Sequence, residues 1–330
     1  MASFTVYRLY FTSPLHIGDN RLDYGISLKT IQSDTLYAAI ISNLVMTGQK
    51  VVDGDLGCTI SSLFPFYQKG EQDKPVYFFP KPLKNSLPVL KDLTKAKQVK
   101  KVAWLDKEYF QKLIHGKKLF ADEKELDDIK GLFLTKESVP EQFVISEICP
   151  RVTVSRTGKE DAVPFYMDRI SYKDKAGLFF MAEGDTSLLD RGLKILKDNG
   201  IGTDRNVGNG FFEYEVGQIE LDLPDTSDWV MALSMFIPES EEELDKMLKG
   251  ENVAYDFMRR GGWITTPPDN TKRKNVVYAF VPASVFAQPN AMDVECKGKI
   301  VDLNPQIGEK KLLEHPIWRC GKSIFIPCKI

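Results

Sequence analysis

A glycine-rich stretch past the middle of the chain has the residue types that bind phosphate groups. Residues 199–212 read Asn-Gly-Ile-Gly-Thr-Asp-Arg-Asn-Val-Gly-Asn-Gly-Phe-Phe. Clustered glycines let backbone N–H groups approach a ligand closely, and polar neighbours add side chains that bind phosphates or base edges. An ordinary flexible connection is the competing interpretation. The candidate contacts in this stretch are Gly202, Thr203, Asp204, Arg205, Asn206, Gly208 and Gly210.

The elements around this glycine loop, residues 200–210, argue against a nucleotide cofactor. Leucines recur at helical spacing in residues 186–199, Gly200 follows as a helix C-cap, and residues 211–216 read as a strand. Dinucleotide and Walker loops instead leave a strand and open a helix, because the helix N-terminus binds the anion. The Gly-Lys-Ser near the C-terminus is no Walker motif either, since Pro316 stands at its first glycine position. We expect no cofactor.

Composition indicates a globular protein with room for two domains. The chain has 330 residues, of which 43% are hydrophobic and 11% aromatic. Five scattered cysteines without a Cys-x-x-Cys pair favour reduced thiols in the cytoplasm and no metal site. The longest uncharged run, residues 35–49, is too short for a membrane span, and the first residues do not resemble a secretory signal.

The net charge of −2 restricts any contact with nucleic acid to local surfaces. One basic segment, residues 91–118, contains nine lysines against three acidic residues. A solvated lysine-rich face and a track for phosphates explain this segment equally well.

The order of elements begins with a strand and a helix. Residues 4–11 are rich in β-branched and aromatic side chains, and Ser33 is a candidate N-cap for a helix through residue 47. The middle of the chain, residues 50–145, looks irregular and holds one short helical pattern at residues 123–132. We expect this middle to be an insertion.

A β-hairpin is predicted within residues 150–173, before a strand at residues 178–182 and the helix, glycine loop and strand described above. These predicted elements follow one another in the order βαββαβ, which is the order of a ferredoxin-like domain. More strands and one helix, at residues 239–250, follow a break near Pro224. We therefore predict an α+β fold of two tandem ferredoxin-like, RRM-like domains: residues 1–222, with the insertion and hairpin, and residues 223–330.

Several segments together resemble the RAMP superfamily of CRISPR proteins, and more narrowly the family of the fourth Csm subunit of type III-A interference complexes. They span nearly the whole chain, and their order makes the combination specific. Ser155 departs from the pattern, because many relatives have Asp at that place. The segments are Ser13-Pro14-Leu15-His16-Ile17-Gly18 with residues 32–39, the hairpin residues 150–158 with Phe165-Tyr166, the glycine loop, and more weakly residues 315–327.

The resemblance implies a non-catalytic subunit that binds the 5′ tag of the guide RNA. It also implies contacts with the large polymerase-type subunit and the first backbone subunit, and a thumb-like hairpin between guide and target RNA. Proteins bind single-stranded RNA through Arg or Lys side chains, through backbone N–H groups, and through side chains that stack on the bases or hydrogen-bond to them. Besides the glycine loop, the implied RNA-binding residues are His16, Arg21, Ser33, Asp34, Tyr37, Arg151, Arg156, Lys159 and Arg169.

Three alternatives stay open. A guide-processing endoribonuclease could use His16 as general base on a 2′-hydroxyl, although a hydrogen-bonded structural His in this turn is the simpler interpretation. Metal-dependent cleavage of target RNA could use Asp19 or Asp23, although acidic residues in a polar loop are usually solvated. An interaction protein that binds no nucleic acid would suit the acidic net charge.

Overall fold

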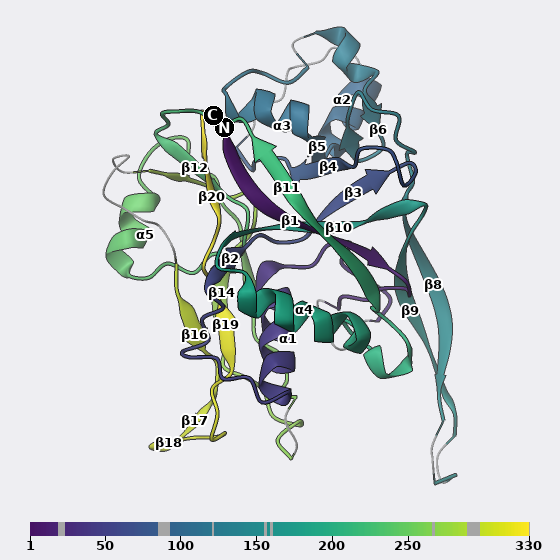
Figure 1. The fold of residues 1–330 in the computed structure, drawn as a ribbon, viewed down its shortest axis with the longest axis vertical. Coiled ribbons are helices and arrows are strands. Elements are labelled where there is room, and N and C mark those ends of the chain that lie inside the picture. Colours follow the sequence, from purple (N-terminus) through teal and green to yellow (C-terminus); the bar gives the residue numbers. More distant parts are fainter. Residues whose placement is uncertain are drawn as a thin grey trace.

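The computed structural model (Figure 1) describes residues 1–18, 24–84, 93–120, 122–154, 157–158, 161–265, 268–288 and 298–329. Its largest element is a mixed, mostly antiparallel sheet centred on β1 (Ala2–Phe11), which lies between β10 (Lys175–Gly184) and β11 (Phe212–Leu221). Thr5 of β1 is opposite both Ala182 and Gln218. Beyond β10, the sheet continues through β3 (Phe64–Gln68), β4 (Val76–Pro80), β5 (Trp104–Asp106), β7 (Phe133–Leu134) and β6 (Ile129–Lys130), and β2 (Cys58–Ile60) also pairs with β10.

Two helices cover one face of this sheet. They are α1 (Ser33–Met46) and α4 (Ser187–Asn199), whose leucines and isoleucines recur every three or four residues and are buried. The helices pack closely at Gly192, where an added Cβ would lie 2.5 Å from Ile40. Because side chains alternate along a strand, Tyr7 of β1 joins this core and Val6 joins the core on the opposite face.

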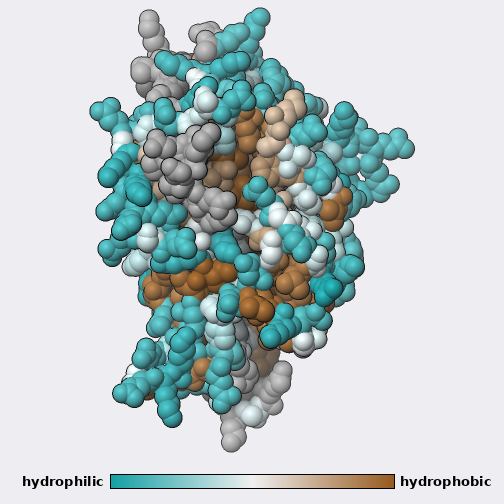
Figure 2. Space-filling view, turned by 60° about the vertical axis from the view of Figure 1, so that its left-hand side comes forward, coloured by the Kyte–Doolittle hydropathy of each residue, from teal (hydrophilic) through white to brown (hydrophobic). Residues whose placement is uncertain are grey.

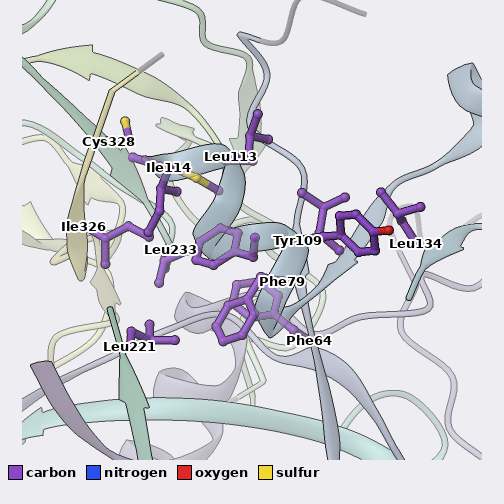
Figure 3. Close-up of a cluster of buried hydrophobic side chains, with 14 of the residues drawn as sticks. Phe64, Phe79, Tyr109, Leu113, Ile114, Leu134, Leu221, Leu233, Ile326 and Cys328 are labelled. Carbon is purple, nitrogen blue, oxygen red and sulfur yellow. The ribbon is translucent and has the colours of Figure 1, made fainter. Parts of the chain in front are cut away.

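The second core lies between the sheet, α3 (Lys107–Ile114) and strands from the C-terminal part of the chain (Figure 3). Phe64 and Phe79 of the sheet point toward Ile114 of α3, and Ile326 and Cys328 approach from the C-terminal strands. The C-terminal part is therefore packed onto the main sheet through buried apolar side chains.

The C-terminal part contains one three-stranded sheet, β12 (Trp229–Ala232) between β15 (Val285–Ala287) and β20 (Phe325–Cys328), and the helix α5 (Glu241–Met247). Three two-stranded ribbons complete it: β13 (Phe257–Arg260) with β14 (Val277–Phe280), β16 (Ile300–Asp302) with β19 (Trp318–Cys320), and β17 (Gln306–Ile307) with β18 (Lys310–Lys311). Figure 2 turns the side of the molecule that carries α5 forward and shows apolar surface in the middle of this face.

The long hairpin of β8 (Val144–Thr153) and β9 (Val163–Tyr172) projects from the body of the molecule (Figure 1). Short helical elements complete the chain: α2 (Leu93–Lys101) and the 3₁₀ turns η1 (Glu123–Leu126) and η2 (Arg205–Val207).

The structure confirms the predicted α+β class. In chain order, β1, α1, β3, β10, α4 and β11 follow the βαββαβ sequence of elements. The tandem of two ferredoxin-like domains, divided at residue 222, stays a prediction, because the C-terminal part forms a small sheet and separate ribbons.

Two predictions about the middle of the chain are wrong. Residues 50–145 are not irregular, because they supply β2 to β7 of the main sheet, including the strand beside β10, and their being an insertion stays a prediction. Pro65 argues against a strand in the sequence, but Phe64 and Phe66 on either side of it are buried against the sheet core. The helix expected at residues 123–132 is only the turn η1, followed by β6.

Candidate nucleic-acid interface

The glycine loop packs tightly against the first loop of the chain, residues 12–32. The N–H of Thr203 donates to the carbonyl oxygen of His16 at 2.9 Å, and the N–H of Gly210 donates to that of Pro14 at 2.9 Å. A side chain at Gly202 would collide with the His16 carbonyl, and one at Gly210 would collide with the Ile201 carbonyl. These two glycines therefore permit close packing inside the protein, and their backbone is not open to a ligand.

The tip of the glycine loop is exposed. It consists of η2, which lies between two left-handed residues, Asp204 with φ +58° and Gly208 with φ +93°. Arg205, Asn206 and Val207 are exposed, and within the described residues the side chains of Arg205 and Asn206 make no hydrogen bond. Of the predicted contacts in this loop, Arg205 and Asn206 thus have the most exposed side chains.

Arg169 of β9 ties the hairpin to the glycine loop. Its Nη2 donates to Oδ1 of Asn209 at 2.9 Å, and Asn209 is fully buried. Arg169 is itself half-buried, and its Nε has no acceptor in the described chain. Sequence analysis predicts a phosphate contact here, whereas the structure shows a side chain that positions the loop.

His16 occupies the interior between the first loop and the hairpin. Its side chain belongs to a residue that is only 1% exposed, and Nδ1 lies 2.7 Å from the carbonyl oxygen of Asp168. Because a carbonyl oxygen only accepts, Nδ1 must donate and carry the proton. This burial supports the interpretation as a structural His, and the RNA contact of His16 stays a prediction without support from the structure.

Ser33, Asp34 and Tyr37 are also buried, at 3%, 1% and 2% exposure, so the structure gives no support to the prediction that they face RNA. The N–H of Met235 donates to Ser33 Oγ at 2.9 Å, and the Tyr37 hydroxyl donates to the carbonyl oxygen of Gly54. Ser33 is not the N-cap of α1 either, because Gln32 holds that position. The C-terminal part of the chain covers this helix start.

Asp34 is held by two arginines from the C-terminal part. Its carboxylate accepts bonds from Arg260 Nε at 2.6 Å and Nη2 at 2.9 Å, and from Arg319 Nη1 at 3.0 Å. Lys274 lies close enough to Arg319 for the guanidinium to lower the pKa of its ammonium group. We call Arg260, Lys274 and Arg319 the cation cluster. Sequence analysis missed it, and the basic runs at residues 259–260 and 272–274 are the only signal that points to it.

The hairpin carries an exposed apolar strip. Residues paired across the two strands point to the same face, which places Ile148, Val152 and Tyr166 on one side, at 60%, 57% and 66% exposure. Arg151 is half-buried, opposite Phe165. The predicted contacts Arg21, Arg156 and Lys159 lie outside the described residues.

In the part of the chain that the structure describes, no group of three or more His, Cys, Asp or Glu side chains could hold a metal ion; Asp19 and Asp23 lie outside it. Burial raises the pKa of the Cys320 thiol to about 11 and that of Cys328 to about 12, so both favour the unreactive protonated form. No described helix is both long and apolar enough to span a membrane.

The sequence is similar to known CRISPR proteins. The family model described as the CRISPR Csm4 C-terminal domain matches residues 225–328. Csm4 of Thermococcus onnurineus is 26% identical over 70% of this chain and 75% of its own length. Csm4 of Streptococcus thermophilus is 24% identical over 98% of this chain and 99% of its own.

Solved structures share the fold at low sequence identity. A chain of the Csm3–Csm4 subcomplex of the type III-A CRISPR-Cas interference complex matches with a TM-score of 0.59, at 17% identity, over the full length of both chains. A chain of the Csm1–Csm4 cassette in complex with cA4 matches with a TM-score of 0.56, over 100% of this chain and 99% of that one.

The family model and the curated relatives support a RAMP protein of a CRISPR system. Within that class, the chain is similar to Csm4 proteins, and its residues 225–328 match the Csm4 C-terminal domain.

Proposed function

We propose that this chain is a non-catalytic subunit of a type III-A CRISPR effector complex, acts in the cytoplasm and binds the 5′ tag of the guide RNA. The observation that supports this most is the exposed tip at Arg205 and Asn206. It stands on a loop fixed by hydrogen bonds to the first loop and, through Asn209, to Arg169 of the hairpin. A loop whose backbone is already fixed loses little conformational entropy when its side chains bind a ligand.

The chemistry of the tip suits single-stranded RNA. The Arg205 guanidinium can bind a phosphate in bidentate geometry, and the Asn206 amide can donate to and accept from a base edge. Because the whole chain carries a net charge of −2, binding depends on such local cations and not on a general basic surface.

We further propose contacts with the large polymerase-type subunit and the first backbone subunit. Relatives were solved as a Csm1–Csm4 cassette and a Csm3–Csm4 subcomplex. The exposed strip at Ile148, Val152 and Tyr166 gives the hairpin an apolar face for a neighbouring subunit or for unstacked bases of target RNA.

The alternative of a guide-processing ribonuclease is less well supported. A general base must come within hydrogen-bonding reach of the hydroxyl it deprotonates, and the buried His16 side chain does not reach the surface.

The test is to purify the tagged chain from its own cells and to identify the proteins and RNA that elute with it. We expect CRISPR subunits and guide RNA with an intact 5′ tag. Arg205→Ala should weaken retention of the tagged guide, whereas Arg191→Ala, which removes an exposed arginine on α4, should not. Elution without RNA or CRISPR subunits would overturn the proposal, and cleavage of repeat RNA by the chain alone would replace it with the ribonuclease.

A further inference from the structure

Within the described residues, the cation cluster holds more positive charge than the neighbouring acidic side chains compensate. Arg260 and Arg319 both bond the carboxylate of Asp34, which is 1% exposed, and the Lys274 ammonium lies near Arg319. The described chain gives the Lys274 ammonium no hydrogen bond and no ion pair. Three cations and one anion leave an excess of two positive charges.

Part of this excess charge is deeply buried. The Arg319 side chain is only 9% exposed, and its Nε has no acceptor in the described part of the chain. Burial and, as the smaller cause, the neighbouring Arg319 charge lower the pKa of Lys274 to about 8. Burying a charge without a partner costs several kcal/mol, so proteins rarely keep such a group without a use for it.

The cluster can be approached from one side. Arg260 ends β13, and the next residues are Gly261 and Gly262. Gly262 has φ +107°, and an added Cβ would meet no atom within 4 Å. The N–H of Lys274 donates to the Gly262 carbonyl, which keeps this open turn next to the ammonium group. A ligand can therefore come close to the backbone of this turn, beside Lys274.

The surrounding ribbon is basic as well. Residues 257–280 contain five cations, Arg259, Arg260, Lys272, Arg273 and Lys274, against the single acid Asp269. The guanidinium of Arg273 stacks on the Trp263 ring at 4.9 Å, which holds one of these cations in place. This local field attracts anions although the whole chain is slightly acidic.

We propose that the cation cluster is a phosphate-binding site, in which Lys274 and Arg319 bind a phosphate group that approaches over Gly262. A phosphate oxygen supplies the acceptor that Lys274 Nζ lacks, and its negative charge compensates the excess. The same chemistry is offered by a backbone phosphate of RNA and by a free nucleotide. The site is separate from the glycine loop and does not depend on the function proposed for that loop.

Lys274→Met tests the site with little risk to the fold, because the described chain gives the Lys274 side chain no hydrogen bond that the substitution would break. Lys272→Met is the matched control, since it removes an exposed lysine two residues away that pairs with Asp269. The purified full chain is titrated by calorimetry with inorganic phosphate, with ATP and with single-stranded oligouridylate.

We expect the wild-type chain to bind at least one probe, Lys274→Met to bind it roughly tenfold more weakly, and Lys272→Met to bind it as the wild type does. A loss for oligouridylate alone identifies RNA as the source of the phosphate, and a loss for ATP or phosphate alone identifies a free nucleotide. Three outcomes would refute the proposed phosphate site. Lys274→Met could bind the probes as well as the wild type does, both variants could lose the same affinity, or no probe could bind to the wild type.

The outcome is distinguishable from that of the glycine-loop proposal. If Arg205→Ala weakens RNA binding and Lys274→Met does not, the phosphate site is wrong while the proposed function stands. If only Lys274→Met weakens binding, the cation cluster stands and the glycine-loop contact is wrong.

Discussion

The carboxylate of Asp34 accepts a hydrogen bond from Nη1 of Arg319, 285 residues later in the chain, at 3.0 Å. Arg260 binds the same carboxylate through two nitrogens. The first residues of α1 thereby connect the N-terminal sheet to two ribbons of the C-terminal part. This helix start is an internal junction of the molecule, and its burial explains why Asp34 is not available to RNA.

Asp34→Asn should lower the free energy of unfolding by about 3–5 kcal/mol, because it leaves two largely buried guanidinium groups without an anion. Urea unfolding of both chains measures the difference. Asp198→Asn is the control: this exposed carboxylate on α4 lies 3.8 Å from Lys197, and its loss should change stability by less than about 0.5 kcal/mol. Equal effects of the two substitutions would contradict the conclusion that Asp34 connects the N-terminal sheet to the C-terminal part.

Gly202→Ala and Gly208→Ala should differ although both residues have positive φ. Each substitution places a side chain in strained backbone, at a cost of about 1–2 kcal/mol. Only the Cβ at residue 202 also collides with the His16 carbonyl, whereas that at residue 208 meets open space. We expect Gly202→Ala to be less stable than Gly208→Ala by about 1–3 kcal/mol in thermal unfolding. The reverse order would contradict the close packing of Gly202 against the His16 carbonyl.

His16→Ala should destabilise the chain by about 1–3 kcal/mol, since it leaves the buried Asp168 carbonyl without its donor and opens a cavity. Guide RNA that elutes with the variant should keep the length found with the wild type. Sequencing of the bound RNA provides the check. If the variant is produced in normal yield but carries unprocessed guide precursors, the result supports the alternative in which His16 is a catalytic residue.

Arg205→Ala should reduce the salt dependence of guide binding. A single phosphate contact on single-stranded RNA contributes about 0.7 to the slope of log K against log salt concentration. Binding of tagged RNA measured over a range of potassium chloride gives this slope for the variant and the wild type. Arg191→Ala, on α4, should leave the slope unchanged, and an unchanged slope in Arg205→Ala would exclude a phosphate contact at this side chain.

Lys274 should make stability rise with pH. Its pKa is lowered from 10.5 to about 8 in the folded chain, so the unfolded chain binds more protons between these values. Stability therefore increases as pH rises through this window, by at most about 3 kcal/mol, and is lowest when Lys274 is forced to be charged below pH 8.

The measurement is urea unfolding at pH 8 and pH 10 in phosphate-free buffer, compared with Lys274→Met. The difference between the chains removes the contribution of tyrosines and cysteines that titrate in the same range. The stability difference should shrink as pH rises, because the wild-type ammonium loses its proton. A constant difference would mean that Lys274 keeps an ordinary pKa.

Sequence alone determined the elements whose evidence is local. The strand at β1, the helices α1 and α4 and the glycine after α4 follow from spacing within a few residues, and the helix-to-strand order around the glycine loop excluded a cofactor motif. The resemblance to CRISPR proteins likewise rests on segments in fixed order, and the relatives confirm it. Arg205 and Asn206 were found because glycines mark the loop that exposes them.

Tertiary structure decided what depends on distant partners. Asp34 and His16 look like surface residues in sequence, because their polar side chains carry no sign of the arginines and carbonyl that pair with them across more than 150 residues. The strands between residues 58 and 80 contain prolines, and pairing with neighbouring strands and burial in the core stabilise them. Periodicity reports which residues share a face, whereas pairing and burial are set by the whole chain, so the cation cluster became visible only when the fold brought its members together.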